Sequence, residues 1–193
     1  MKKGIGVGIE DFREVIREDC YYFDKTNYIE ELIKDKTKIK LFTRPRRFGK
    51  TLNMSTLKYF FDVKNAEENR KLFKDLYIEK SEYFKEQGQY PVIFITLKDL
   101  KKNTWKEMNF EIKELLRNLY DEFNFIRDTL SISDLREFDK IWLKEEDANY
   151  DSSLLNLTKY LYNYYKKEVF LLIDEYDSPL ITANRKGYYK EAI

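Results

Sequence analysis

The chain has 193 residues, enough for one domain with a sizeable buried core. Its 36 basic and 35 acidic residues give a formal charge of +1, which does not support a dedicated nucleic-acid binder. The absence of histidine excludes Ser-His-Asp catalysis, Cys-His catalysis and every histidine metal site within this sequence. Carboxylates, lysines, arginines and hydroxyls remain, and this set suits phosphoryl chemistry on Mg²⁺.

The single cysteine, Cys20, rules out an intrachain disulfide and suits a reducing compartment. The residues after Met1 lack the apolar run of a secretory signal peptide. No stretch approaches the roughly 20 apolar residues that a membrane span requires. We therefore expect a cytoplasmic protein without a membrane partner, organised as one domain over residues 1–193.

The first third of the sequence predicts two short helices, a strand and a longer helix. The two short helices have apolar residues at helical spacing, which are Phe12, Val15 and Ile16 in one and Tyr28, Ile29, Leu32 and Ile33 in the other. Asp24 is expected to cap the second of them. Lys38–Thr43 predicts a buried strand, and Thr51–Phe61 predicts the helix after it.

Helices alternate with apolar strands in the rest of the sequence. The expected elements are helices at Leu72–Tyr77 and Ser81–Gly88, a strand at Pro91–Leu97, helices at Trp105–Phe123 and Leu154–Tyr164, and a strand at Val169–Ile173. Ser178 and Pro179 predict the N-cap and first position of a further helix. This alternation predicts an α/β protein with a mostly parallel sheet between layers of helices.

The residues between the first predicted strand and its helix read R-P-R-R-F-G-K-T and predict a phosphate-binding loop. Gly49 lets the backbone approach phosphates, Lys50 can reach the β- and γ-phosphates, and Thr51 can bind Mg²⁺. The usual pattern G-x-x-x-x-G-K-[ST] would place its first glycine where this chain has Arg44. A basic surface turn is the alternative interpretation of the loop.

Neighbouring residues complete the expected nucleotide contacts. They are Arg44, Arg46, Arg47, Phe48 and Leu52. One of the arginines is expected to contact a phosphate or to stabilise transferred charge. A solvated basic loop, or pairing of these arginines with nearby acids, is the alternative.

The third predicted strand ends in Asp174 and Glu175, which form the second half of the expected site. Ligands of open parallel sheets bind at the carboxyl ends of the strands, where Asp174 could hold Mg²⁺ through water. Glu175 could then orient or polarise the attacking water. Helix capping and compensation of the helix dipole are the alternative for these two acids. Both halves together, each after an apolar strand, predict a site for Mg-ATP.

Three segments resemble the bacterial AAA-ATPase-like family: F-D-K-T at 23–26, L-F-T-R-P-R-R-F-G-K-T-L-N at 41–53, and L-I-D-E-Y-D-S-P-L at 172–180. The resemblance implies that Arg44 is a family trait at the glycine position. It also implies a P-loop NTPase three-layer sandwich with helical insertions, in which two more strands follow the one that carries Asp174. We therefore expect the sheet of this chain to be incomplete. Related ATPases contact adenine from the N-terminal side, so Tyr22 or Phe23 could stack on the base, with core packing as the alternative.

The resemblance favours an ATP-binding module with Mg²⁺-dependent hydrolysis in the complete protein, and with slow or absent hydrolysis in this chain. One alternative is a module that binds ATP without useful turnover and passes a change of shape to a protein client. Another is a role in a DNA-associated defence or mobile-element protein, because such proteins often carry a PD-(D/E)xK nuclease-like domain. Exposed sheet edges would also favour self-association.

Overall fold

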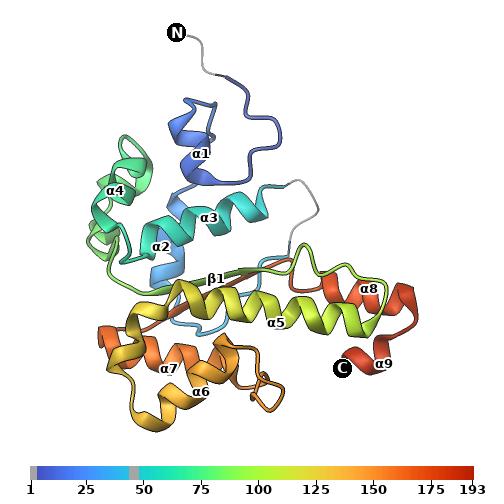
Figure 1. The fold of residues 1–193 in the computed structure, drawn as a ribbon. Helices are drawn as coiled ribbons and strands as arrows, with labels where there is room; N and C mark the ends of the chain where they lie inside the picture. Colours follow the sequence, from blue (N-terminus) through green and yellow to red (C-terminus); the bar gives the residue numbers. More distant parts are fainter. Residues whose placement is uncertain (1–3, 44–47) are drawn as a thin grey trace. The chain divides into compact units, whose positions relative to one another are not determined.

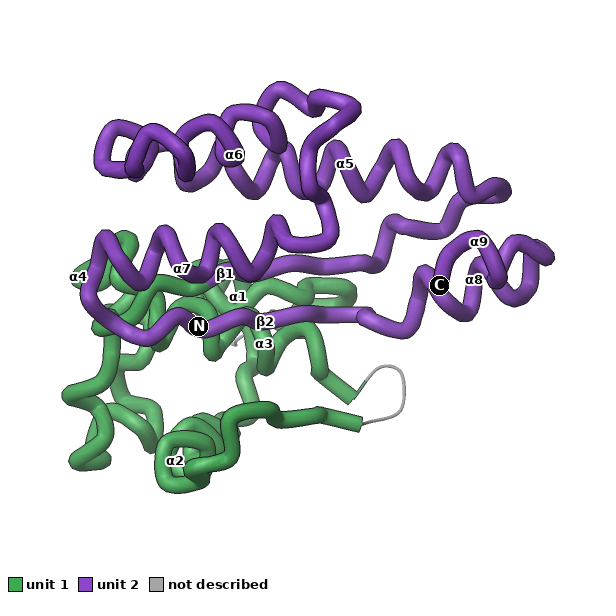
Figure 2. The backbone as a smooth tube through the Cα atoms, turned by 90° about the horizontal axis from the view of Figure 1, so that it is seen from below, with its two compact units in different colours: residues 1–92 green, residues 93–193 purple. Residues whose placement is uncertain are grey.

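The computed structural model describes residues 4–43 and 48–193 of the chain. The chain divides into two compact units, Met1–Val92 and Ile93–Ile193, shown in separate colours in Figure 2. Each unit is described by itself below. None of the described helices combines the length and the apolar character needed to cross a membrane. The assignment of residues 1–193 to one domain stays a prediction.

The first unit is built from short helices (Figure 1). They are α1 (Phe12–Arg17), α2 (Asn27–Lys34), α3 (Lys50–Phe61) and α4 (Ala66–Arg70), followed by 3₁₀ turns η1 (Lys71–Phe73), η2 (Tyr77–Lys80) and η3 (Glu82–Glu86). Phe12, Phe60 and Phe73 are fully buried at the centre of this unit. The ring of Phe73 lies 5.1 Å from that of Phe12 and 5.4 Å from that of Phe60, so aromatic packing joins α1, α3 and η1.

Polar contacts also fasten α1 to α3. One carboxylate oxygen of Asp11 caps α1 by accepting from the backbone N–H of Glu14 at 3.1 Å. The other oxygen accepts from the hydroxyls of Tyr59, at 2.8 Å, and Ser55, at 3.2 Å. The hydroxyl of Ser55 in turn accepts from the N–H of Phe12 at 2.8 Å. The helix expected to bind phosphate is therefore held from behind by a satisfied polar network.

The predicted strand at Lys38–Thr43 does not form. None of its backbone groups makes a hydrogen bond to another described residue, and Ile39 and Leu41 are 86% and 67% exposed. An extended segment becomes a strand only when a neighbouring strand accepts and donates its ladder bonds. Local order here comes instead from Asp35, whose carboxylate accepts from the N–H of Thr37 and pairs with Lys40 at 2.7 Å.

The second unit contains a two-stranded parallel sheet of β1 (Val92–Thr96) and β2 (Phe170–Asp174). Its helices are α5 (Trp105–Glu122), η4 (Asn124–Thr129), α6 (Ile132–Trp142), α7 (Ser153–Tyr165), α8 (Ser178–Lys186) and α9 (Tyr189–Ala192). Ile93 and Ile95 of β1 share one buried cluster with Tyr120, Phe138 and Leu157. Helix α5 runs along this sheet in Figure 1, and its apolar face covers β1.

The second and third predicted strands are confirmed, as are the long helices between them. The structure is a mixed α/β fold with a small parallel sheet, consistent with an incomplete sheet. Two predicted caps are wrong. Thr26 is the N-cap of α2, without a side-chain cap, because Asp24 accepts from Thr26 itself. Helix α8 begins at Ser178 after Asp177, because the Ser178 hydroxyl is already donated to Glu175.

Candidate functional site

The first half of the candidate site is the N-terminus of α3. Gly49 is its N-cap and has a left-handed backbone, with φ 72° and ψ 27°. A Cβ at this position would meet no atom within 4 Å, so the conformation rather than crowding favours glycine. Gly49 has no side chain with which to cap the helix, whose first residues are Lys50 and Thr51. An uncapped helix start with a lysine and a hydroxyl has the donors and the positive dipole that a phosphate requires.

Of the other residues expected to contact the nucleotide, the structure describes Phe48 and Leu52. Arg44, Arg46 and Arg47 lie outside the described residues, so their expected phosphate contacts stay predictions. Phe48 is 60% exposed, and Leu52 is half-buried in the first turn of α3.

A cavity of about 150 Å³ lies beside this helix start. One wall is formed by Gly49, Leu52 and Asn53, and the other by the N-terminal segment, which contributes Gly6, Ile9, Val15, Cys20, Tyr21, Tyr22, Phe23 and Lys25. The aromatic segment expected near the base therefore lines the same cavity as Gly49, the glycine expected to bind phosphate. Because all of these residues belong to the first unit, the cavity is defined within it.

The two aromatic residues proposed for base contact have different surroundings. Tyr22 packs edge-on against Phe12, with ring centres 5.2 Å apart, and burial raises the pKa of its hydroxyl to about 12. That hydroxyl oxygen is buried without a hydrogen-bond partner among the described residues. Phe23 is 80% exposed. The Tyr22 ring is therefore half-buried and packed within the first unit, whereas the Phe23 ring is largely exposed.

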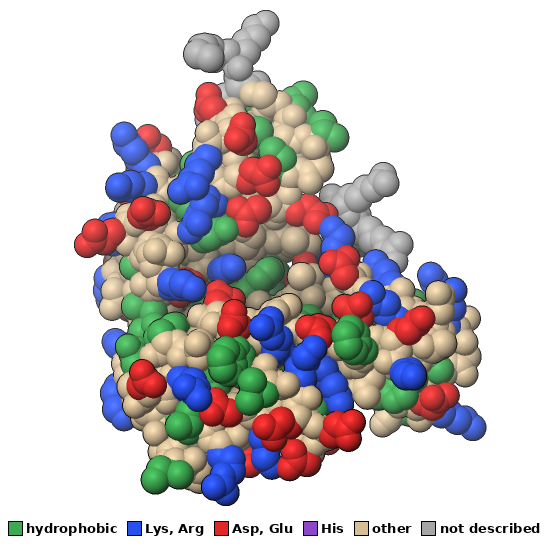
Figure 3. Space-filling model, viewed as in Figure 1, with side chains coloured by type: hydrophobic (Ala, Val, Ile, Leu, Met, Phe, Trp, Pro, Cys, Tyr) green, Lys and Arg blue, Asp and Glu red, His purple; other side chains and the backbone are tan. Residues whose placement is uncertain are grey.

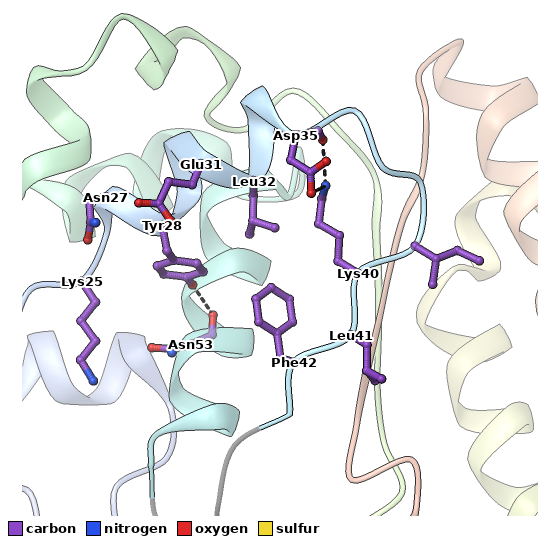
Figure 4. A pocket seen from close by; sticks show the side chains of 11 residues that line it. Lys25, Asn27, Tyr28, Glu31, Leu32, Asp35, Lys40, Leu41, Phe42 and Asn53 are labelled. Carbon is purple, nitrogen blue, oxygen red and sulfur yellow. Dashed lines mark hydrogen bonds and ion pairs between the residues drawn. The ribbon is translucent and has the colours of Figure 1, made fainter.

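A larger and more open cavity of about 660 Å³ lies between α2 and the segment before the loop (Figure 4). Tyr28 crosses its floor and donates its hydroxyl to the carbonyl of Asn53 at 2.5 Å, and burial raises the pKa of Tyr28. The rings of Phe42 and Tyr28 and the side chain of Leu32 face this space in Figure 4. Lys25 and Asn53 line both cavities.

The second half of the candidate site lies at the end of β2. Asp174 is its last residue and is 4% exposed, and its carbonyl accepts from the N–H of Leu97 at 3.0 Å. Glu175 follows with a left-handed backbone, at φ 54°, which is costly for a residue that has a Cβ. Ser178 donates its hydroxyl to the Glu175 carboxylate at 2.8 Å and its N–H to the Glu175 carbonyl at 3.0 Å.

Ser178 is a residue of this half that the sequence argument assigned only to helix capping. Its two bonds to Glu175 fix both the side chain and the backbone of the expected catalytic acid. The sequence did contain a signal for this contact, which is a serine three residues after an acid at the end of a strand. Residues at that spacing come together in a turn.

The two halves belong to different units, so whether Thr51 and Asp174 meet at one Mg²⁺ stays a prediction. No group of three or more Cys, Asp or Glu side chains suited to a metal occurs among residues 4–43 and 48–193. A Mg²⁺ site on nucleotide needs fewer protein ligands, because phosphate oxygens and water supply the others.

A family model described as "Predicted AAA-ATPase" matches residues 6–193. The chain belongs to the AAA-ATPase-like family. A protein of Azotobacter chroococcum mcd 1, named as an uncharacterized protein in the vnfD 5′ region, is 41% identical over 61 residues. That match covers 31% of this chain and 12% of the relative's length. No solved structure matches the chain.

Membership of the AAA-ATPase-like family supports an ATPase module that uses a nucleotide. On the face shown in Figure 3, basic and acidic side chains are interspersed, as the formal charge of +1 also indicates. A broad basic surface of the kind that tracks nucleic-acid backbones is not seen on that face.

Proposed function

We propose that this AAA-ATPase-like chain binds Mg-ATP at the N-terminus of α3. The observation that carries the proposal is the left-handed Gly49, which opens an uncapped helix beginning with Lys50 and Thr51. Backbone N–H groups of the first turn would hold the phosphates, and the Lys50 ammonium would neutralise the β- and γ-phosphates. The Thr51 hydroxyl would supply one oxygen to Mg²⁺.

The cavity of about 150 Å³ supports a place for the base beside that helix. Adenine would enter between the N-terminal segment and Leu52, with Phe23 stacking on one face. Tyr22 would form the wall rather than stack, because its ring is already packed on Phe12. Arg44, Arg46 or Arg47 would add a phosphate contact from the loop, and Phe48 would flank it.

Hydrolysis is the further part of the proposal and depends on the second unit. Asp174 would hold Mg²⁺ through a water molecule, and Glu175 would orient the attacking water. The left-handed backbone at Glu175 supports a functional role, because such strain is retained where surrounding structure enforces a geometry.

A nucleotide-switched module without turnover is the second candidate, and one contact favours it. The Ser178 hydroxyl occupies a carboxylate oxygen of Glu175 at 2.8 Å, and a water activated by that oxygen would have to share or replace this bond. In this candidate ATP binding would change the conformation of the protein for a protein client, and Glu175 would be a structural acid.

Isothermal titration of the folded chain with Mg-ATP tests binding. We expect the wild type to bind, and Lys50→Ala to weaken binding about 100-fold through loss of a charge-assisted contact. Lys85→Ala, which removes an exposed lysine of η3, is the matched control and should bind as the wild type does. Absence of both heat and thermal shift with the folded wild type would refute the proposal.

Phosphate release by Glu175→Gln separates the two candidates. If Glu175 activates water, this substitution abolishes turnover and leaves Mg-ATP affinity unchanged. Wild-type turnover that Glu175→Gln abolishes would therefore exclude the switch without turnover, and wild-type turnover that Glu175→Gln retains would exclude Glu175 as the residue that activates water.

A further inference from the structure

Lys25 stands between two residues whose side chains are fully engaged. One carboxylate oxygen of Asp24 accepts from the N–H of Thr26 at 2.8 Å and from its hydroxyl at 2.7 Å, and the other accepts from the N–H of Tyr77 at 2.7 Å. Thr26 is completely buried, and its hydroxyl oxygen accepts from the N–H of Ile78 at 3.1 Å. The backbone on both sides of Lys25 is therefore tied to η2.

The side chain of Lys25 is not used by this arrangement. Within the part of the chain that the structure describes, its ammonium pairs with no carboxylate, and its one aromatic contact is Phe23, with the ring centre 5.9 Å away. Figure 4 shows the side chain extended along α3, on the side where Asn53 projects. The fixed backbone limits where the exposed and unpaired ammonium of Lys25 can reach. A solvated surface lysine is the simpler explanation that an experiment must exclude.

Lys25 lines the cavity of about 150 Å³ together with Gly49 and Leu52, and it also lines the larger cavity. A nucleotide with its base in the smaller cavity and its terminal phosphates at the start of α3 must place its α-phosphate between these two points. An ammonium group donates in every direction and accepts nothing, so it suits a phosphate oxygen and cannot read a donor of the base.

The geometry points to Lys25 as a second phosphate-binding lysine that contacts the α-phosphate of the bound nucleotide. This inference rests on the proposed function. In this arrangement three side chains contact different parts of the nucleotide. Phe23 stacks on the base, Lys25 binds the α-phosphate, and Lys50 binds the β- and γ-phosphates. The Asp24 and Thr26 contacts then act as positioning interactions for Lys25.

The test compares Mg-ATP, AMP and adenosine by titration calorimetry with the full chain. Lys25→Ala should weaken both Mg-ATP and AMP binding about tenfold, because each ligand carries an α-phosphate. Adenosine binding should change less than about twofold, and Lys25→Arg should retain most of the affinity for AMP. Lys50→Ala should instead separate the two ligands, with a large loss of affinity for Mg-ATP and little change in affinity for AMP. Lys85→Ala is the control for removal of a surface charge.

The outcomes separate this inference from the proposed function. A wild type that binds no Mg-ATP overturns both. A wild type that binds, with Lys25→Ala binding Mg-ATP and AMP equally well, overturns the role of Lys25 alone. If Lys25→Ala weakens adenosine and AMP binding equally, Lys25 contacts the base or the ribose, and the proposed phosphate contact is wrong. Lys25→Ala removes no hydrogen bond recorded within the described residues, so its thermal midpoint should match that of the wild type.

Discussion

Two segments that were both predicted to be strands have different structures in this protein. Lys38–Thr43 in the first unit and β1 in the second were both expected to be buried strands. Ile93 of β1 is fully buried beside β2, whereas Ile39 is 86% exposed and its segment makes no backbone ladder among the described residues. The difference teaches that an apolar extended sequence defines a candidate strand, and a neighbouring strand decides whether it forms.

The same contrast extends to the two halves of the candidate site. Asp174 ends a paired strand, Glu175 follows it, and Ser178 donates a hydrogen bond to the carboxylate of Glu175. The phosphate half depends on α3, which Asp11 and the aromatic core hold from one side. Substitutions in each half can therefore test how much the structure around it contributes to the stability of that half.

The largest expected effect comes from matched isoleucine truncations. Ile93→Ala should reduce the free energy of unfolding by about 2–5 kcal/mol, because it leaves a cavity in the core of the second unit. Ile39→Ala should change it by less than about 0.5 kcal/mol, because the side chain is already in water. Urea denaturation followed by circular dichroism measures both. Equal losses would mean that Ile39 is buried in solution and that its segment has found a partner strand.

Amide hydrogen exchange tests the ladder itself and is the next effect in size. The amides inside β1 and β2 should exchange at least about 100-fold more slowly than those of Ile39, Leu41 and Phe42. The amides of Ile39, Leu41 and Phe42 precede the proposed phosphate loop. Their exchange rates with and without Mg-ATP can therefore be compared in the same protein. Comparable protection in the two segments without ligand would contradict the structure of Lys38–Thr43.

The sequence predicted the long helices and the two paired strands from the spacing and length of their apolar runs. Helix α5 was predicted from its apolar spacing, and the structure adds a capping box of Thr104 and Glu107 at its start. The start of α3 follows from Gly49, Lys50 and Thr51. In contrast, the exposure of Lys38–Thr43 was not predictable, because local sequence does not report whether a distant strand is present.

Two details of the site were also beyond sequence reasoning. Ser178 was expected to cap a helix, but its hydroxyl donates to Glu175, because a serine hydroxyl can accept from a helix N–H or donate to a nearby carboxylate. Lys25 lies in the F-D-K-T segment, which does not by itself indicate phosphate binding, and the two cavities that it lines suggest that role.

Backbone strain should have a smaller effect on stability, and it can be measured in both halves of the candidate site. Gly49 and Glu175 both have positive φ, at 72° and 54°. Gly49→Ala should cost about 1 kcal/mol, because alanine is strained in this region even where space is available. At position 175 the glycine variant should be more stable than the alanine variant by about 1 kcal/mol, which reverses their usual order in regular structure.

Thermal midpoints of these variants provide the measurement. Comparing Glu175→Gly with Glu175→Ala removes the carboxylate from both, so the lost bond to Ser178 cancels and backbone strain remains. An alanine variant as stable as the glycine variant would show that Glu175 adopts an ordinary backbone in solution.

The smallest expected effect concerns two exposed Asp–Lys pairs, one in each unit. Asp35 pairs with Lys40 at 2.7 Å, and Asp147 pairs with Lys140 at 2.6 Å. These partners hold the pKa of each aspartate below its usual value of 3.8, and Thr37 adds two further bonds to Asp35. A lowered native pKa stabilises the fold above the unfolded pKa, and this contribution is lost as the pH falls through the native value.

Replacement of either aspartate by asparagine should therefore lower the unfolding midpoint slightly at neutral pH and should have less effect as the pH falls below about 3.8. Asp35→Asn should have the larger effect, because Asp35 accepts from Thr37 as well as pairing with Lys40, whereas Asp147 pairs with one lysine. Both effects should shrink in about 0.5 M salt, since the pairs are solvent-exposed. A larger loss for Asp147→Asn would show that the turn at Asp35 contributes little, and that Lys38–Thr43 owes its conformation to contacts beyond this ion pair.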